Sequence, residues 1–254
     1  MILAVDIGNT MTHAAVFQGN KIITLKKFPT ASKSIKKFTS SFGAKYKKNI
    51  AQVGIASVVT KEYSQWKDLV EELFSVKPIF INHNLLLPVN LRLKNPVKIG
   101  ADRICNAVAA YEFFRKKENV IAADFGTAVT YDIVLKNGDY IGGIISPGVE
   151  TMAKSLYRFT SKLPMLKRNE MYIPRNIIGK NTVEALRAGT AFASVASFEG
   201  IFAKIEKDLK RKFKVILSGG FARQIHAKTA VKTVIRENLV LEGINCILKY
   251  NNAN

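Results

Sequence analysis

Cysteine and histidine are scarce in this chain of 254 residues. The two cysteines, Cys105 and Cys246, show no CxxC spacing, which argues against both a disulfide scaffold and a zinc site. The three histidines (His13, His83 and His226) are scattered, with no pair at the spacing of zinc ligands. We therefore expect the three histidines at the surface or in packing positions.

Long apolar runs are also missing. The first apolar stretch follows no basic region and meets Asp6 almost at once, so the sequence predicts neither a signal peptide nor a membrane span. Hydrophobic residues make up 48% of the chain and charged residues 23%, which is the balance of a folded globular protein. We expect a soluble cytoplasmic protein of one large domain or two lobes, with no membrane partner.

Acidic residues are few: the chain has 19 Asp and Glu against 39 Lys and Arg, for a net charge of +20. Such a charge attracts any polyanion, whether nucleic acid, membrane headgroups or ATP. The lysines are spread over the whole chain, however, and few aromatic residues interleave with them as stacking platforms. We therefore favour a solvated lysine-rich surface over a nucleic-acid site.

One pattern occurs twice. Residues 2–20, ILAVDIGNTMTHAAVFQGN, are matched by residues 121–139, IAADFGTAVTYDIVLKNGD. Each copy has an apolar run, an acidic residue (Asp6 or Asp124), a small polar turn, alternating apolar residues and a Gly/Asn turn. This order is typical of a strand, a tight loop, a second strand and a hairpin turn, so the chain is predicted to be duplicated.

The loop inside each copy suits phosphate chemistry. Glycine lets backbone N–H groups approach phosphate oxygens closely, and an aspartate at the strand end can hold a cation beside them. The alternative is an ordinary turn in which Asp and Asn only satisfy backbone groups. Because the acidic residue recurs in register, we favour phosphate transfer over a purely structural repeat.

Strand and helix patterns alternate along the rest of the chain. We expect strands at 51–59, 76–81 and 213–217, an amphipathic helix at 61–75, and an irregular connector over 83–99. Asn181 and Glu184 have the spacing of a capped helix start. The predicted class is α/β, with two duplicated lobes at 1–118 and 119–254, each a sheet backed by helices.

Three further motifs leave alternatives open. Gly100–Arg103 places a carboxylate and a guanidinium at a helix start, where they suit a general base and a substrate clamp, or where Asp102 is simply the N-cap. Residues 148–155 nearly spell a Walker A loop, but Glu150 would stand among the phosphates, so a P-loop is disfavoured. Ser218-Gly219-Gly220 suits either contact with adenine or ribose or a plain strand-to-helix turn.

Taken together, DIGNT at residue 6, GADR at 100, DFGTAVTYD at 124, GGIISPG at 142, IGKNT at 178 and SGG at 218 resemble the type III pantothenate kinases. The resemblance runs the length of the chain. It implies the acetate and sugar kinase/heat-shock chaperone/actin-like fold, with two ribonuclease H-like lobes and a nucleotide cleft between them. It also implies ATP-dependent phosphorylation of pantothenate to 4′-phosphopantothenate, the first step towards coenzyme A.

The same resemblance implies roles for individual residues. The ATP phosphates and Mg²⁺ would be bound by a loop that consists of Asp6, Ile7, Gly8, Asn9, Thr10, Met11, Thr12 and His13. Within this loop, Asp6 would hold the Mg²⁺ that ATP carries. Thr127 would contact phosphate from the other lobe, and Asp124 would coordinate K⁺ or NH₄⁺. Pantothenate would be held by Gly100, Ala101, Asp102, Arg103 and Thr182, with Asp102 as the general base.

Three positions depart from the family pattern. Leu93 stands where many members have a tyrosine, Val129 replaces a threonine, and His13 occupies a variable position.

The family is typically homodimeric, with substrate sites close to the subunit interface, so we expect a dimer. Two rival functions are a non-catalytic, regulatory or nucleic-acid-associated protein on the same fold, and a kinase for another small hydroxylated metabolite.

Overall fold

The computed structural model describes residues 1–30, 38–59 and 63–253, and the chain divides into two compact units. Unit 1 consists of Met1–Lys117, Val134–Gly142 and Asn238–Asn254, and unit 2 consists of Glu118–Ile133 and Gly143–Glu237. These units differ from the expected lobes mainly in the segments 134–142 and 238–254, which both belong to unit 1, and at Glu118, which belongs to unit 2.

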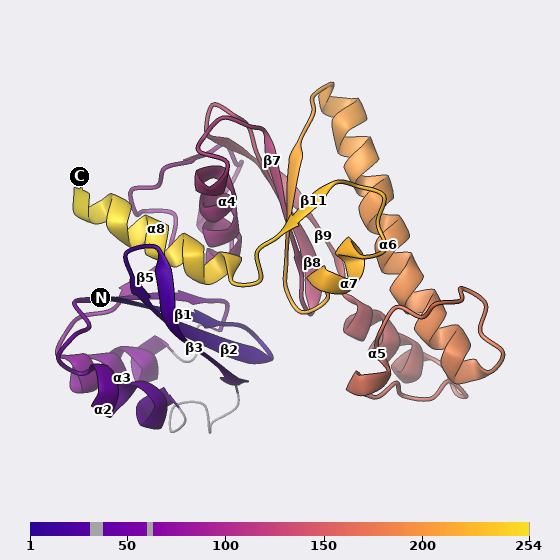
Figure 1. The fold of residues 1–254 in the computed structure, drawn as a ribbon, viewed down its shortest axis with the longest axis horizontal. Helices are drawn as coiled ribbons and strands as arrows, with labels where there is room; N and C mark the ends of the chain where they lie inside the picture. The colour runs from indigo at the N-terminus through magenta and orange to yellow at the C-terminus, as the bar shows by residue number, and fades with distance from the viewer. Residues whose placement is uncertain (31–37, 60–62, 254) are drawn as a thin grey trace. The chain divides into compact units, whose positions relative to one another are not determined.

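Unit 1 is built on a five-stranded sheet with the strand order β3-β2-β1-β4-β5 (Figure 1). Its strands are β1 (Ile2–Ile7), β2 (Met11–Gln18), β3 (Lys21–Pro29), β4 (Gln52–Ser57) and β5 (Ile79–Phe80). The first three strands form an antiparallel meander, and β4 and β5 continue the sheet in parallel with β1. The expected strand at 51–59 is confirmed, whereas the one expected at 76–81 has only two residues.

Alternate residues of these strands build two separate cores, as the period of a strand requires. One face packs against α4 (Ala101–Phe113) and α8 (Leu239–Ala253), through side chains that include Ala4, Ala15, Phe17 and Ala56. The other face packs against α3 (Tyr63–Phe74) and the short turn η1 (Thr39–Gly43), through side chains that include Leu3, Val5, Val16 and Ile55. A short helix, α2 (Ala44–Tyr46), completes this second layer.

Of the amphipathic helix expected at 61–75, residues 61 and 62 lie outside the described residues, and the rest is confirmed in α3, whose buried residues are Trp66, Val70 and Phe74. Trp66 is completely buried against Phe38, with their ring centroids 4.9 Å apart. Burial of such a side chain contributes about 1.5–3 kcal/mol, so the 3.6-residue apolar period is what holds this helix to the sheet.

A second sheet has the order β11-β10-β7-β8-β9-β6. Its strands are β6 (Asn90–Leu91), β7 (Val120–Phe125), β8 (Ala128–Val134), β9 (Asp139–Pro147), β10 (Lys214–Ser218) and β11 (Thr233–Ile235). The order β9-β8-β7-β10-β11 repeats β3-β2-β1-β4-β5, and in both sheets the central strand is parallel to the strand that follows the meander. The predicted duplication is confirmed.

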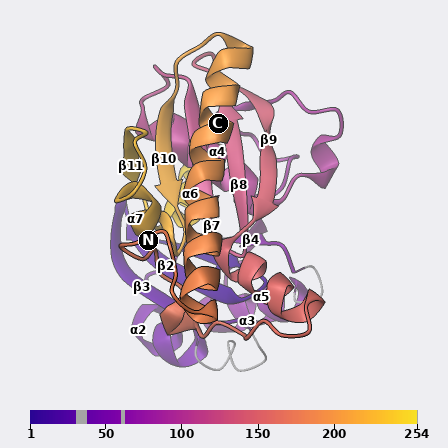
Figure 2. The ribbon, with the colours of Figure 1, turned by 90° about the vertical axis from the view of Figure 1, so that its right-hand side faces the viewer.

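The helices of unit 2 are α5 (Val149–Phe159), α6 (Thr182–Leu209) and α7 (Ala222–His226), with the short turn η4 (Arg168–Glu170). The long helix α6 covers one face of the unit 2 sheet and runs along its strands (Figure 2), and Phe198 of α6 packs against the rings of Phe125 and Tyr131. Asn181 caps α6 by accepting a hydrogen bond from the backbone N–H of Glu184 at 3.0 Å, so the predicted helix start is confirmed.

The expectation of an irregular connector over 83–99 is only partly right. Within it, Asn90 and Leu91 form β6, paired in parallel with Asp139 and Tyr140, and Pro96–Lys98 form the 3₁₀ turn η3. Such short elements have no period to detect. Among the helices of the described residues, none has the length and apolar character of a membrane span.

Candidate active site

The loop between β1 and β2 carries the first predicted phosphate contacts. Its tip residues, Asn9 and Thr10, are exposed, and the backbone N–H of Gly8 donates to the carbonyl of Met11 at 3.1 Å. Asp6 precedes this loop on β1, with 18% of its side chain exposed. The loop thus presents a carboxylate and exposed polar residues at the carboxyl end of a buried strand.

Two residues of the predicted loop have buried side chains. Ile7 belongs to the core on the α3 face, and Thr12 is completely buried with its hydroxyl 3.0 Å from that of Thr30. Their side chains therefore shape the loop from within, and only their backbone atoms remain to meet a ligand.

Asp6, His13 and Lys27 form one row across three neighbouring strands of the sheet. The Nδ1 atom of His13 lies 3.8 Å from a carboxylate oxygen of Asp6, and that carboxylate by itself would favour a protonated ring. Burial of the ring opposes protonation more strongly, and Lys27 adds to its effect, so the pKa of His13 is lowered to about 4. His13 is therefore neutral near pH 7.

The GADR motif begins helix α4. Gly100 is the N-cap, and the carboxylate of Asp102 accepts the backbone N–H of Arg103 at 2.9 Å. The alternative in which Asp102 is the N-cap is therefore wrong, because this residue lies inside the first turn. A Cβ atom on residue 100 would stand 2.4 Å from Oδ1 of Asp102, so glycine is what leaves room for the carboxylate over the helix terminus.

Burial raises the pKa of Asp102 above its ordinary value, although the N–H and the guanidinium of Arg103 act in the opposite direction. A carboxylate whose proton affinity is increased in this way is a better general base than a solvated aspartate. The side chain of Ala101, in contrast, is buried in the core of unit 1 and has no reach toward a substrate.

Cys105, one turn further along α4, links the loop and the helix terminus. Burial raises the pKa of its thiol far above the usual range, and the carboxylates of Asp6 and Asp102 raise it further. Both aspartates therefore lie within electrostatic reach of one buried residue of unit 1. The packing agrees with this, because Asp6 shares a sheet face with Ala4, and Ala4 packs in one core with Cys105 of α4. Unit 1 thus has Asp6 and the start of α4 on the same side of its sheet.

In unit 2, Asp124 lies near the end of β7, opposite Ser218 on β10. Gly219 has a φ of +87°, and a Cβ atom there would lie 2.4 Å from Oδ1 of Asp124. The SGG turn therefore serves a close approach to Asp124, which is a role that the sequence did not predict. Nothing in this geometry bears on adenine or ribose.

Thr127 follows in the loop between β7 and β8. Its side chain is exposed, and its carbonyl accepts the backbone N–H of Gly148 at 3.0 Å and the hydroxyl of Thr151 at 2.5 Å. The start of α5 thus holds the Thr127 peptide with its carbonyl toward the protein. Residues 149–159 are helical, with Glu150 paired to Lys154 at 2.6 Å, which excludes the disfavoured P-loop.

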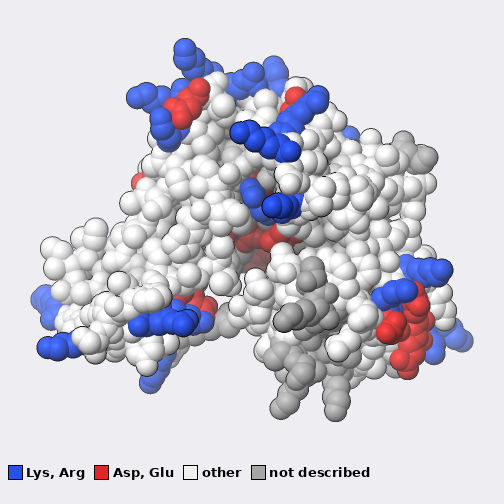
Figure 3. All heavy atoms as spheres, turned by 180° about the vertical axis from the view of Figure 1, so that it is seen from behind, with Lys and Arg blue, Asp and Glu red and all other residues white. Residues whose placement is uncertain are grey.

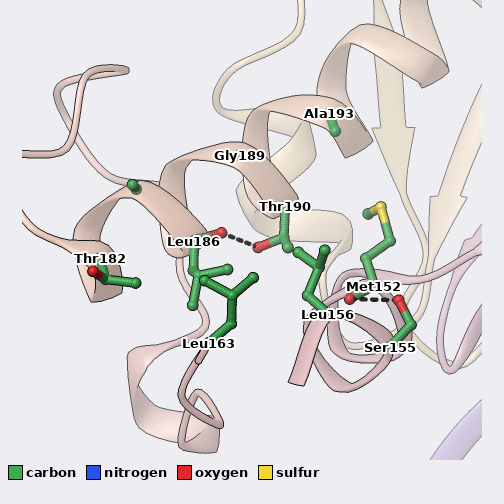
Figure 4. A pocket seen from close by; sticks show the side chains of 10 residues that line it. Met152, Ser155, Leu156, Leu163, Thr182, Leu186, Gly189, Thr190 and Ala193 are labelled. Carbon is green, nitrogen blue, oxygen red and sulfur yellow. Dashed lines mark hydrogen bonds between the residues drawn. The ribbon is translucent and has the colours of Figure 1, made fainter. Parts of the chain in front are cut away.

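Thr182 is the first residue of α6 and lines an apolar groove of about 480 Å³ between α5 and α6. Figure 4 shows Leu156, Leu163 and Leu186 converging in this groove, with Thr182 at the helix end. The hydroxyl of Thr190 donates to the carbonyl of Leu186 at 2.9 Å, so its proton is engaged within α6. Large apolar side chains in the chain segment from the end of α5 to the residues before α6 are exposed, among them Phe159, Met165, Ile177 and Ile178.

The carboxylates of the candidate site fit a cation whose other ligands are substrate phosphates and water. Among the described residues, no three of His, Cys, Asp and Glu lie close enough together to hold a metal ion. Asp6 and Asp124 each offer a carboxylate in their own unit. Mg²⁺ is commonly bound through one or two carboxylates together with substrate phosphates and water, so Asp6 suits that mode.

Lys and Arg side chains lie in separate small groups on the face shown in Figure 3, several of them beside acidic side chains. Such mixing is typical of a solvated surface. On this face the charge of +20 is not gathered into one continuous patch.

Thr30 supports the β1–β2 loop, although no sequence motif includes it. Thr30, directly after β3, donates its hydroxyl to the carbonyl of Gly8 at 2.7 Å. The sequence shows only a threonine after a proline at a strand end, and no pattern indicates which loop it contacts.

Comparison with known proteins identifies close relatives over the whole chain. The family model described as type III pantothenate kinase matches residues 2–204. A type III pantothenate kinase from Sulfurihydrogenibium sp. is 37% identical, covering 98% of this chain and 100% of the relative. Another from Myxococcus xanthus is 34% identical and covers 100% of both.

Solved structures share the fold at lower identity. A Baf family protein from Campylobacter jejuni, described as a transcriptional activator, superposes with a TM-score of 0.62 at 20% identity, covering 99% of this chain and 100% of that chain. A ROK family glucokinase from Streptomyces griseus, bound to glucose and AMPPNP, has a TM-score of 0.52 at 14% identity, covering 100% and 99%. The predicted actin-like fold of duplicated lobes is confirmed.

Proposed function

The chain belongs to the type III pantothenate kinase family, and on that premise we propose that it transfers the γ-phosphate of ATP to pantothenate. The product is 4′-phosphopantothenate, which enters coenzyme A biosynthesis. The observation that carries the proposal is that, within unit 1, Asp6 lies on the sheet face that packs against α4, the helix whose first turn holds Asp102.

The β1–β2 loop binds the ATP phosphates in this proposal. The exposed tip at Asn9 and Thr10 offers backbone N–H groups to phosphate oxygens, and Asp6 holds Mg²⁺ through the nucleotide. The metal supplies charge neutralisation at the γ-phosphate. In unit 2, Thr127 contacts phosphate and Asp124 coordinates K⁺ or NH₄⁺.

Asp102 is the general base. It accepts the proton of the primary hydroxyl of pantothenate as that oxygen attacks the γ-phosphorus, and ADP leaves with the electron pair of the broken bond. Burial, which raises the pKa of Asp102, supports this role. Phosphoryl transfer needs little further covalent help, so most of the acceleration comes from alignment and charge neutralisation.

Pantothenate is held around the start of α4 and by Thr182. The guanidinium of Arg103 suits the carboxylate of pantothenate because it can donate two parallel hydrogen bonds. The substitution of leucine for tyrosine at Leu93 removes a hydroxyl, and Leu93 packs instead against the unit 1 core. Val129 is 2% exposed, so its change from threonine alters packing rather than an exposed ligand contact.

A second copy of this chain occupies the α5–α6 groove in our proposal. The groove is lined mainly by apolar side chains, and Phe159 at the end of α5 and Ile178, which precedes α6 in the chain, are each 80% exposed. Apolar surface of this kind is stabilised when a partner covers it. The enzyme is then a cytoplasmic homodimer with Thr182 near the subunit interface.

One assay separates this function from its rivals. Purified protein is supplied with ATP, Mg²⁺ and K⁺ and with either pantothenate or a panel of other small alcohols, and ADP and phosphorylated product are measured. Turnover that requires pantothenate and a monovalent cation supports the proposal. Turnover with another alcohol only indicates a different kinase, and absence of any turnover favours a regulatory protein on the same fold.

A further inference from the structure

We propose that Thr30 is a positioning residue for the phosphate-binding loop, an inference that rests on the proposed use of ATP. Thr30 follows β3, and its relative exposure is only 6%. It makes three contacts to the β1–β2 segment: its hydroxyl with Gly8, its backbone N–H with Thr10, and its hydroxyl with that of Thr12.

The first two contacts turn carbonyl groups toward the protein. The Thr30 hydroxyl donates to the carbonyl of Gly8 at 2.7 Å, and the Thr30 backbone N–H donates to the carbonyl of Thr10 at 3.0 Å. A carbonyl oxygen repels a phosphate, whereas a backbone N–H attracts it. By engaging the carbonyls on both sides of Asn9, Thr30 keeps the negative ends of these peptides away from a bound anion.

The third contact gives the arrangement a direction. A hydroxyl has one proton, and Thr30 donates its proton to the carbonyl of Gly8. The Thr12 hydroxyl, 3.0 Å away, must therefore be the donor to the oxygen of the Thr30 hydroxyl. The resulting chain runs from Thr12 through Thr30 to the Gly8 carbonyl. Bonds in such a chain polarise one another, and both threonine side chains are sheltered from water that would compete.

These contacts give the buried Thr12 a defined function. Thr12 belongs to the predicted phosphate loop, yet its hydroxyl meets Thr30 rather than the surface. It therefore acts on the nucleotide through Thr30 and Gly8. Loop geometry, and with it ATP affinity, should depend on the Thr30 hydroxyl more than on the volume of the side chain.

The test compares Thr30→Val, Thr30→Ala and Thr30→Ser with the wild type. Valine keeps the shape of threonine and removes the hydroxyl, and serine restores the hydroxyl without the methyl group. We expect Thr30→Val and Thr30→Ala to raise both the Kd for Mg·AMPPNP and the KM for ATP about tenfold, whereas the KM for pantothenate changes less than twofold. Thr30→Ser should return both ATP values to within about threefold of the wild type.

The matched control is Thr24→Val, which removes a hydroxyl of β3 that is hydrogen-bonded to Tyr46 and makes none of the loop contacts described above. This variant should leave the ATP values unchanged even where its melting temperature falls. The inference is overturned when Thr30→Val and Thr30→Ala bind Mg·AMPPNP as the wild type does, or when Thr30→Ser is no better than alanine.

Calorimetric binding of Mg·AMPPNP separates this inference from the proposed function. Wild-type protein that binds the nucleotide but does not phosphorylate pantothenate contradicts the function and still leaves the affinities of the Thr30 variants to decide the inference. Wild-type protein that does not bind the nucleotide overturns both. Circular dichroism identifies a valine variant that fails to fold, in which case the alanine and serine variants decide.

Discussion

The carboxylate of Asp102 occupies the space that a side chain on residue 100 would need, because Oδ1 lies 2.4 Å from the ideal Cβ position of Gly100. The same carboxylate accepts the backbone N–H of Arg103 at the start of α4. Gly100 therefore determines where the candidate base stands, without contributing a reactive group of its own.

Substitution of Gly100 by alanine should displace the Asp102 carboxylate. A displacement of about 1 Å at a reacting group can cost roughly 100-fold in rate, so we expect kcat/KM for pantothenate to fall roughly 10- to 100-fold. The Kd for Mg·AMPPNP should not change, because the β1–β2 loop is untouched.

The matched control is Gly200→Ala in α6, where a Cβ atom would meet nothing within 4 Å. That change should leave kinetics unaltered and stabilise the helix by about 0.5–1 kcal/mol, measured by urea unfolding. Wild-type kinetics in Gly100→Ala would show that the close contact with Asp102 has no bearing on catalysis.

The acid limb of the pH–rate profile should reflect Asp102. Burial raises the pKa of this carboxyl above the ordinary 3.8, so kcat/KM for pantothenate should begin to fall at a higher pH than a solvated aspartate would cause. Steady-state kinetics between pH 4 and 9 measure this limb. A profile that stays flat down to the ordinary aspartate pKa is the result that argues against a buried base.

His13 should make stability depend on pH. Its pKa is about 4 in the folded protein and 6.5 in the unfolded chain, so only the unfolded chain binds this proton between those values. The contribution of His13 is complete above pH 6.5 and is lost as the pH falls toward 4, by roughly 2–3 kcal/mol.

Urea unfolding of the wild type and of His13→Asn at pH 4.5–7 measures this difference, because asparagine does not titrate in this range. The two stability curves should diverge as the pH falls. An NMR titration that places the pKa of His13 near 6.5 would contradict the burial described above.

The α5–α6 groove should be the surface that a second copy covers. Leu156 lines it and is 37% exposed, so Leu156→Glu places a charge where the apolar contact is proposed. Light scattering should show the wild type at twice the chain mass and the variant at the chain mass. Lys207→Glu, an exposed charge reversal elsewhere on α6, is the control and should remain dimeric; a dimeric Leu156→Glu would reject this surface.

Much of the fold could be predicted because it follows from local patterns. The repeated hairpins and the apolar period of α3 are visible in the sequence, and the two sheets have the predicted relationship. The return of α8 to unit 1 was not predictable, because the pattern of residues 239–253 does not reveal its partner. Cores that join distant segments depend on tertiary packing rather than on a period.

The candidate site likewise has parts that local motifs predict and parts that they do not. The motifs identified Asp6, Asp102 and Asp124, because acidic residues beside glycine at strand and helix ends are recognisable. The contact of Thr30 with the β1–β2 loop and the space left by Gly219 for Asp124 could not be predicted, because both depend on atoms that approach across long sequence separations.

The most direct test of the account compares Asp102→Asn with the wild type at saturating Mg·ATP and pantothenate. Asparagine keeps the shape of the side chain and cannot accept the hydroxyl proton, so kcat should fall by about 10²–10⁴. The Kd for Mg·AMPPNP, measured on the same preparations, should stay within about twofold. Wild-type turnover of pantothenate by Asp102→Asn would contradict the account.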